Sequence, residues 1–223
     1  TDLQKHDLNL VLQKRYALLN WQQGSGKTAA VYHRAKYLLK FRKAKNVIIL
    51  APAIATNMTW IPFLTINKER FRTIQTAGDL NNIPEGTFLV VSTSMLRKLK
   101  RGLMRFVKRT SGKLCLVFDE SDEITNPTSQ RTRNILCIFR RLRYKILDTG
   151  TTTRNNIAEL YSQFELLYNN SVNMICWSPQ VYHENRGHEI EEENNPDYGT
   201  PFPAFRGHVL FRACHCPGKA TVF

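Results

Sequence analysis

The stretch Gly24-Ser25-Gly26-Lys27-Thr28 has the residue types and spacing of a phosphate-binding loop. Glycines let successive backbone N–H groups turn toward one anion, and a following helix adds the positive end of its dipole. The Lys27 ammonium can then reach the β- and γ-phosphates, and the Thr28 hydroxyl can ligate Mg²⁺. The full eight-residue motif begins with a further glycine, where this chain has Trp21. The loop predicts a nucleotide site.

A second group of reactive side chains follows the apolar run at residues 114–118. Asp119 and Glu120 come directly after it, and carboxylates at the end of a buried strand are costly unless a cation compensates them. In phosphoryl-transfer enzymes one acid holds the metal and another group orients and deprotonates the attacking water. We therefore predict that Asp119 holds Mg²⁺ together with Thr28, and that Glu120 is the catalytic base beside Lys27. If Asp119 and Glu120 are considered without the glycine-rich loop, the alternative is that they are solvated carboxylates at the end of a strand.

Both groups need a sheet to bring them together. Apolar, strand-like runs recur at intervals that fit helices, and several are continuous rather than alternating, which is typical of strands covered on both faces. This alternation predicts an α/β fold with a mostly parallel sheet, helices on both faces and ligands at the strand ends. The expected strands are residues 16–20, 46–52, 71–77, 88–94, 114–120 and 144–150, and the expected helices are residues 27–43, 56–68, 95–109, 129–141 and 155–168.

The composition indicates the kind of partner. The 223 residues carry 32 Lys and Arg against 18 Asp and Glu, a formal net charge of +14, and 42% of them are hydrophobic, enough for a core. The basic residues cluster at 34–45, 97–109 and 131–145. One such cluster is often only a solvated helix face, but several in one α/β domain favour a polyanion, above all the nucleic-acid backbone.

Other features bear on location and metals. The longest apolar runs are too short to cross a bilayer, the first residues show no charged-then-apolar leader, and five scattered cysteines fit a reducing compartment. We expect an intracellular protein without membrane contact, cytoplasmic if the source is bacterial or phage and nuclear if it is eukaryotic. The Cys214-His215-Cys216 stretch, with Cys176 upstream, lacks the paired spacing of a zinc knuckle, so we expect cysteines without metal.

The residues from Asp119 onward carry a resemblance to a known family. DESDEITNPTSQ at 119–130 resembles the Asp-Glu-x-His motif of superfamily 2 helicases in its Swi/Snf-like form, with Asp122 in place of histidine. LDTGTTTRNNIAEL at 147–160 is similar to the family's third motif, Leu-Thr-Gly-Thr-Pro-x-x-Asn followed by Glu-Leu, with Asp148 for leucine and Thr152 for proline. The matching residues are Asp119, Glu120, Ile124, Asn126, Ser129, Thr149, Gly150, Thr151, Asn155, Glu159 and Leu160.

Two further stretches resemble motifs of this family and occur in the same order along the chain. VIILAPAIATNMTW at 47–60 resembles the motif after the second strand, through Pro52 and Trp60, with a spacing one residue longer. FLVVSTSML at 88–96 is similar to the strand and turn that lead to another nucleic-acid contact. The resemblance implies a RecA-like P-loop domain, the first lobe of an ATP-dependent translocase or helicase that contacts duplex DNA. The residues it implies for nucleic-acid binding or coupling are Pro52, Ser92, Thr93, Thr149, Gly150, Thr151 and Asn155.

The start of the chain occupies the place of the family's glutamine motif, which reads adenine. Asp7 stands where the glutamine is expected, and either Gln4 or His6 could serve instead. In this family the second lobe supplies an arginine finger, and no arginine here lies in a recognisable second-lobe motif. We therefore expect residues 1–170 to form the ATP-binding lobe, and the chain to bind ATP yet hydrolyse it slowly. Residues 171–223 are expected to be an irregular insertion or the start of a linker to a second lobe absent from this chain.

Two other function classes stay open at this point. A single-lobe P-loop nucleoside-triphosphatase or kinase would use the same loop and Mg²⁺ but would not need a strongly basic lobe. A nucleic-acid-binding module with a vestigial nucleotide site would fit the departures at Asp122, Asp148 and Thr152. The sequence does not choose between unwinding, translocation and remodelling, or between DNA and RNA, and it leaves the oligomeric state unknown.

Overall fold

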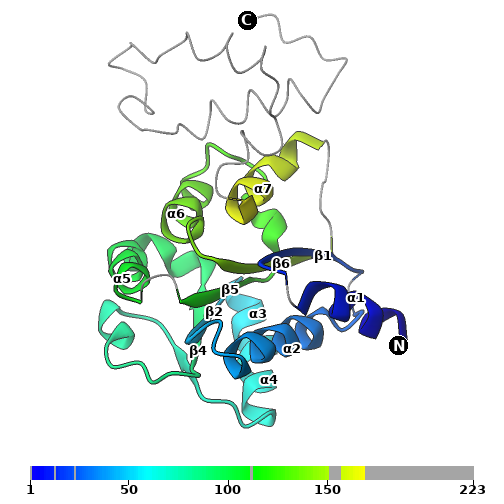
Figure 1. The fold of residues 1–223 in the computed structure, drawn as a ribbon. Helices are drawn as coiled ribbons and strands as arrows, with labels where there is room; N and C mark the ends of the chain where they lie inside the picture. The colour runs from blue at the N-terminus through cyan, green and yellow to red at the C-terminus, as the bar shows by residue number, and fades with distance from the viewer. Residues whose placement is uncertain (1, 13, 23, 111–112, 151–156, 169–223) are drawn as a thin grey trace, which may run out of the picture.

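Six parallel strands form one sheet in a computed structural model of the chain, which describes residues 2–12, 14–22, 24–110, 113–150 and 157–168 (Figure 1). The strands are β1 (Tyr16–Asn20), β2 (Asn46–Ala51), β3 (Phe71–Thr73), β4 (Phe88–Ser92), β5 (Leu114–Phe118) and β6 (Tyr144–Thr149). Their order across the sheet is β1-β6-β5-β2-β4-β3, and each neighbouring pair is parallel. The predicted α/β fold class is confirmed.

Helices cover both faces of this sheet (Figure 1). One face carries α1 (Asp2–Leu12), α2 (Lys27–Lys40), α3 (Ala53–Ala55), the π-helical turn η1 (Thr56–Trp60) and α4 (Ile61–Ile66). The other face carries α5 (Leu96–Arg109), α6 (Gln130–Phe139) and α7 (Tyr161–Tyr168). Short 3₁₀ turns η2 (Ala77–Leu80), η3 (Thr93–Met95), η4 (Ser121–Ile124) and η5 (Ile157–Leu160) connect these elements.

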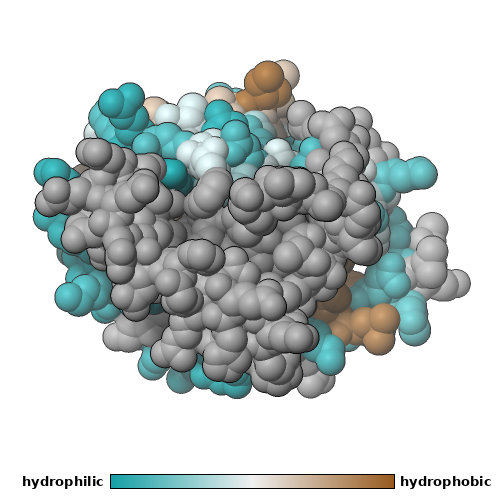
Figure 2. Space-filling view, turned by 90° about the horizontal axis from the view of Figure 1, so that it is seen from above, coloured by the Kyte–Doolittle hydropathy of each residue, from teal (hydrophilic) through white to brown (hydrophobic). Residues whose placement is uncertain are grey.

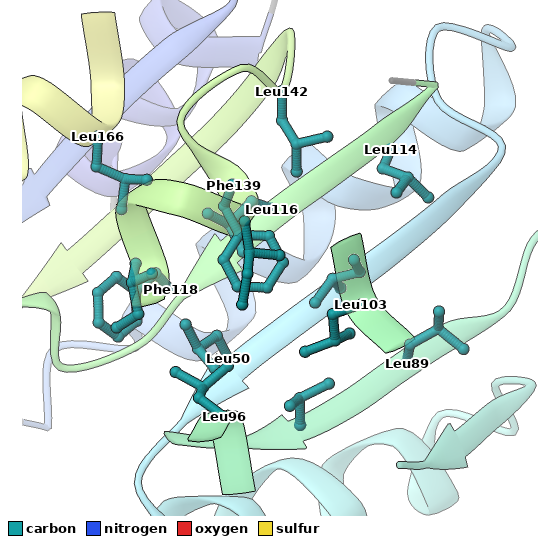
Figure 3. Close-up of a cluster of buried hydrophobic side chains, with 14 of the residues drawn as sticks. Leu50, Leu89, Leu96, Leu103, Leu114, Leu116, Phe118, Phe139, Leu142 and Leu166 are labelled. Atoms are coloured by element: carbon teal, nitrogen blue, oxygen red, sulfur yellow. The ribbon is translucent and has the colours of Figure 1, made fainter. Parts of the chain in front are cut away.

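The continuous apolar strands divide their side chains between two hydrophobic clusters. All six residues of β2 are buried, as a strand covered on both faces requires. Val47 and Ile49 pack toward α2, whereas Leu50 belongs to the cluster under α5 and α6. In Figure 3 the side chains of Leu50 and Phe118 lie in this second cluster together with those contributed by the helices. The alternation along each strand therefore fixes which helix covers which face.

Most expected elements are present, with three differences. The sequence analysis did not predict α1. The strand expected at 71–77 ends at Thr73, because Thr76 and Asp79 form a capping box that starts η2. The helix expected at 56–68 begins at Ala53 and contains a π-helical turn. Residues 169–223 lie outside the described part of the chain, so the boundary at 170 and the irregular character of the C-terminal segment stay predictions.

None of the described helices combines the length and apolarity that crossing a membrane requires.

Gly102 allows the closest approach between α5 and the turn η2. A Cβ at this position would lie 3.0 Å from the Cβ of Ala77 and 3.5 Å from Cδ1 of Leu80. Glycine inside a helix costs about 1 kcal/mol relative to alanine, so its presence here reflects the packing rather than the helix.

We expect Gly102→Ala to lower the free energy of unfolding by roughly 1–2 kcal/mol, because overpacking outweighs the gain in helix propensity. Ala77→Gly in the same chain removes the contacting Cβ, and the two changes should therefore be coupled by about 1 kcal/mol. Urea denaturation of the four chains measures this coupling. Additive effects would contradict the proposed close contact.

Candidate functional site

The glycine-rich loop joins the end of β1 to the start of α2, as the sequence predicts. Gly24 and Gly26 have φ angles of 75° and 83°, a left-handed backbone that favours glycine. Ser25 tightens the turn, because its backbone N–H and its hydroxyl both donate to the carbonyl of Gln22, at 3.2 and 2.6 Å. Gly26 precedes α2 and no described side chain caps that helix end. The first N–H groups of α2 are thus available to an anion.

Lys27 bends back over the start of this loop. Its Nζ donates to the carbonyl oxygens of Trp21, at 2.9 Å, and Gln22, at 3.4 Å. Trp21, which stands where the motif has its first glycine, therefore acts on the loop through its backbone. Thr28 is the next residue of α2, in the same helical turn. The loop and the two residues predicted to serve phosphate and Mg²⁺ are contiguous at the sheet edge.

Asp119 and Glu120 follow β5 at the same edge of the sheet. The Asp119 side chain is 9% exposed, and its Oδ2 accepts a hydrogen bond of 2.7 Å from the indole Nε1 of Trp60. Glu120 has a φ of 55°, a strained conformation for a residue with a side chain and one that is concentrated at functional sites. Burial, followed by the negative charges of Asp119 and Asp122, raises the pKa of Glu120.

β6 lies between β1 and β5, so its carboxyl end separates the loop from the two acids. Thr149 is buried there, and its hydroxyl donates to Oδ1 of Asp122 at 3.3 Å. The backbone of Gly150 hydrogen bonds to Glu120. Two of the predicted coupling residues thus contact the acidic group directly. Thr151 and Asn155 lie outside the described residues.

Asp148 is the unexpected member of this group. It stands where the resembling motif has leucine and is 1% exposed, and its carboxyl pairs with that of Asp119 but has no other hydrogen-bond partner among the described residues. Burial, followed by the neighbouring carboxylate of Asp119, raises the pKa of Asp148 well above its ordinary value, and the positive charge of Lys27 opposes this shift. The site therefore carries a concentration of negative charge that a bound cation would offset.

The loops after β2 and β4 form a second part of the same edge. Ala51 and Ser92 are partners in the parallel ladder, so Pro52 and Thr93, which follow them, lie at the ends of adjacent strands. The hydroxyls of Ser92 and Ser94 are 2.8 Å apart, while Thr93 is 5% exposed. The structure thus brings the predicted nucleic-acid residues Pro52, Ser92 and Thr93 to neighbouring strand ends.

The structure also distinguishes among the three residues that could take the role of the glutamine motif, Gln4, His6 and Asp7. Nε2 of Gln4 donates to the backbone carbonyl of Ser25 in the phosphate loop, whereas neither Asp7 nor His6 has such a contact among the described residues. Helix α1 is held in this place by the buried guanidinium of Arg34, which donates to the carbonyl of Val11 near the end of α1, at 3.1 Å, and to those of Lys14 and Arg15 just after it. Gln4 is therefore the residue positioned to act beside the loop.

The donor set fits Mg²⁺ as an ion shared with a phosphate ligand. Thr28 and Asp119 offer the hydroxyl and carboxylate oxygens that this ion prefers. No group of three or more His, Cys, Asp or Glu side chains in the described ranges is arranged to hold a metal alone, so phosphate and water oxygens would complete the shell. Cys115 is buried and Cys137 exposed, both as free thiols, and the cysteines from 176 onward lie outside these ranges.

We expect Asp148→Asn to stabilise the chain increasingly as the pH rises in the absence of divalent cations. The contribution of a carboxyl with a raised pKa is fully present below about pH 4 and is lost as the pH rises through the folded-state pKa. Between about pH 4 and the folded-state pKa the variant should gain on the wild type by about 1.4 kcal/mol per pH unit, and the difference should level off above that pKa. Urea denaturation of both chains between pH 4 and pH 8 measures the difference.

Asp79→Asn is the matched control for this measurement. Backbone hydrogen bonds from Gln75 and Thr76 lower the pKa of the half-buried Asp79 carboxyl, so removing it should give a difference of the opposite sign. A stability difference for Asp148→Asn that does not change with pH would contradict the assignment of a buried, uncompensated carboxyl.

Comparisons with known proteins agree on one family. Residues 2–154 match the family model described as type III restriction enzyme, res subunit (ResIII). The ATP-dependent helicase FUN30 of Saccharomyces cerevisiae is 27% identical to the chain over 175 residues, which are 73% of this chain and 15% of the yeast protein.

Two solved structures share the fold. The Sulfolobus solfataricus SWI2/SNF2 ATPase core in complex with dsDNA superposes with a TM-score of 0.60 at 15% identity, over 95% of this chain and 42% of that one. The same ATPase core domain without DNA gives a TM-score of 0.59 at 16% identity, over 94% and 41%. The chain thus spans less than half the length of each of these relatives.

Proposed function

Because the chain belongs to the family of the type III restriction enzyme res subunit and is a first RecA-like lobe of a superfamily 2 helicase, we propose that it is the ATP-binding motor lobe of a Swi/Snf-like DNA translocase. One observation carries the proposal. The glycine-rich loop after β1 and the acids after β5 meet at one edge of the sheet, with the end of β6 between them. Ligands of parallel α/β sheets bind at such an edge.

Each residue of the site has a role in this proposal. The N–H groups of Gly24 and Gly26 bind the β-phosphate, and that of Ser25 joins them once it leaves the carbonyl of Gln22. Lys27 leaves the carbonyls of the loop to bind the transferring phosphoryl group. Thr28 and Asp119 hold the Mg²⁺, which neutralises charge on the phosphates when it is bound.

Glu120 is the base in this proposal. A raised pKa makes its carboxylate a stronger acceptor for the proton of the attacking water at neutral pH. The left-handed backbone of Glu120 and the contact with Gly150 fix the direction of the side chain. Thr149 and Asp122 extend this contact into β6, so a change in the loop after Gly150 would reach the base.

The basic residues indicate the polyanion. Helix α5 begins just after the Ser92–Ser94 turn and has no acidic residue. Figure 2, which views the molecule from above Figure 1, shows that the described residues visible around the edge of this face are mostly hydrophilic. Contacts to phosphates position a protein without reading sequence, so we propose duplex DNA bound with weak sequence preference. The cationic residues of α5 are Arg97, Lys98, Lys100, Arg101, Arg105, Lys108 and Arg109.

We expect Lys27→Ala to weaken ATP binding in the presence of Mg²⁺ by roughly 10- to 100-fold. Hydrogen bonds to charged groups contribute about 1.5–3 kcal/mol, and the alanine removes them from the phosphates. Calorimetric titration of the full chain measures the affinity. Lys40→Ala, which removes an exposed cation from the far end of the same helix, is the control and should leave it unchanged.

Titration of the wild-type chain with ATP and, separately, with duplex DNA distinguishes the function classes. Wild-type chain that binds duplex DNA but no nucleotide would favour a binding module with a vestigial site. Nucleotide binding without any DNA binding would favour a single-lobe nucleoside-triphosphatase.

We expect Arg101→Glu to weaken duplex DNA binding and to make the slope of log affinity against log salt shallower by about one. Each phosphate contact contributes about 0.9 to this slope through release of counterions. Fluorescence anisotropy across a salt series measures both quantities. Lys40→Glu makes the same charge change on the opposite face of the sheet, and an equal effect of the two variants would contradict a DNA surface on α5.

A further inference from the structure

Trp60 connects the segment after β2 to the acid after β5. Its side chain is 1% exposed, and its indole Nε1 donates to Oδ2 of Asp119 across 59 residues of sequence. The strands that precede these two residues, β2 and β5, are neighbours in the sheet. Their hydrogen-bond ladder continues one residue past β5, because the N–H of Asp119 donates to the carbonyl of Leu50 at 2.9 Å. The backbone of Asp119 is therefore fixed by β2, and its side chain by the segment that follows β2.

A π-helical turn brings Trp60 to this position. The N–H of Ile61 donates to the carbonyl of Thr56, five residues back, where an α-helix would bond four residues back. A π-helical turn holds one residue more than an α-helical turn between its bonded groups. The stretch from Pro52 to Trp60 is also one residue longer than the motif it resembles. The turn absorbs this residue, and the indole still points at Asp119.

The opposite side of the same segment is exposed, with Ile54 78% and Met58 77% exposed. Met58 can therefore be removed without loss of a core side chain.

We propose that Trp60 is a positioning residue that holds the Asp119 carboxylate in the orientation required by the Mg²⁺ of a bound nucleotide. The inference rests on the proposed function and assigns a residue that orients the metal ligand of that site. The indole binds one carboxylate oxygen, which fixes the rotation of the group. Groups that orient a metal ligand in this way contribute about 10- to 100-fold to metal affinity.

The indole N–H resonance of Trp60 tests the inference in the wild-type chain. The three tryptophans give three indole N–H resonances in a ¹⁵N-labelled sample, and the resonance that disappears in Trp60→Phe is that of Trp60. Asp119→Asn should move it, which tests the hydrogen bond itself. Addition of Mg²⁺ and ADP should move it too, whereas ADP in EDTA should move it less.

Trp60→Phe also tests the effect on the metal, because it keeps an aromatic ring but removes the donor. The gain in ADP affinity from Mg²⁺ should fall about 10-fold, while the affinity in EDTA stays unchanged. Deletion of Met58 is the second variant, since it should turn the π-helical turn into an α-helical one and preserve the Trp60 resonance. Loss of that resonance position in a folded deletion variant would contradict the role given to the turn.

The outcomes separate this inference from the proposed function. Wild-type chain that binds no ADP overturns both. ADP binding that depends on Mg²⁺, with an unmoved Trp60 resonance and an unchanged Mg²⁺ effect in Trp60→Phe, overturns only the role of Trp60.

Discussion

The register of three parallel strands is the constraint on which the site depends. β6 pairs with β1 on one side and β5 on the other, so the phosphate loop, Asp148 and the acids after β5 end at the same height. No loop has to travel across the sheet to bring them together. The continuous apolar character of these strands, buried on both faces, makes this register costly to change, since a shift by one residue would turn each side chain to the other face.

This arrangement concentrates charge that the apo chain only partly compensates. Asp119, Glu120 and Asp148 share a small region with one cation, Lys27, and burial raises the pKa of both Glu120 and Asp148. Burial and repulsion at this edge disfavour the ionised carboxylates in the ligand-free chain, and the proposed Mg²⁺-nucleotide ligand would relieve that repulsion. The left-handed backbone of Glu120 is a second unfavourable feature of the chain at this site. Stability and ligand binding are coupled through these few groups.

Local patterns predicted what depends on local chemistry. The glycine loop, the acids and all six strands followed from spacing and apolar runs, because each is determined within a few residues. Helix α1 was missed, since its pattern is weak and it is held by Arg34 from another helix. The choice of Gln4 over Asp7 depends on how α1 docks on the loop. The surroundings of Asp148 and the bond of Trp60 to Asp119 depend on strand order, which no local pattern contains.

The hydrogen bonds of Lys27 to the carbonyls of Trp21 and Gln22 give the empty loop an internal competitor. An incoming anion must replace two neutral acceptors that are already in place, without cost in translational freedom. A ligand with a single, weakly charged group gains little from this exchange, whereas a di- or triphosphate offers several charged oxygens at once. In the proposed nucleotide site, these hydrogen bonds would favour ligands of high charge density over small, weakly charged anions.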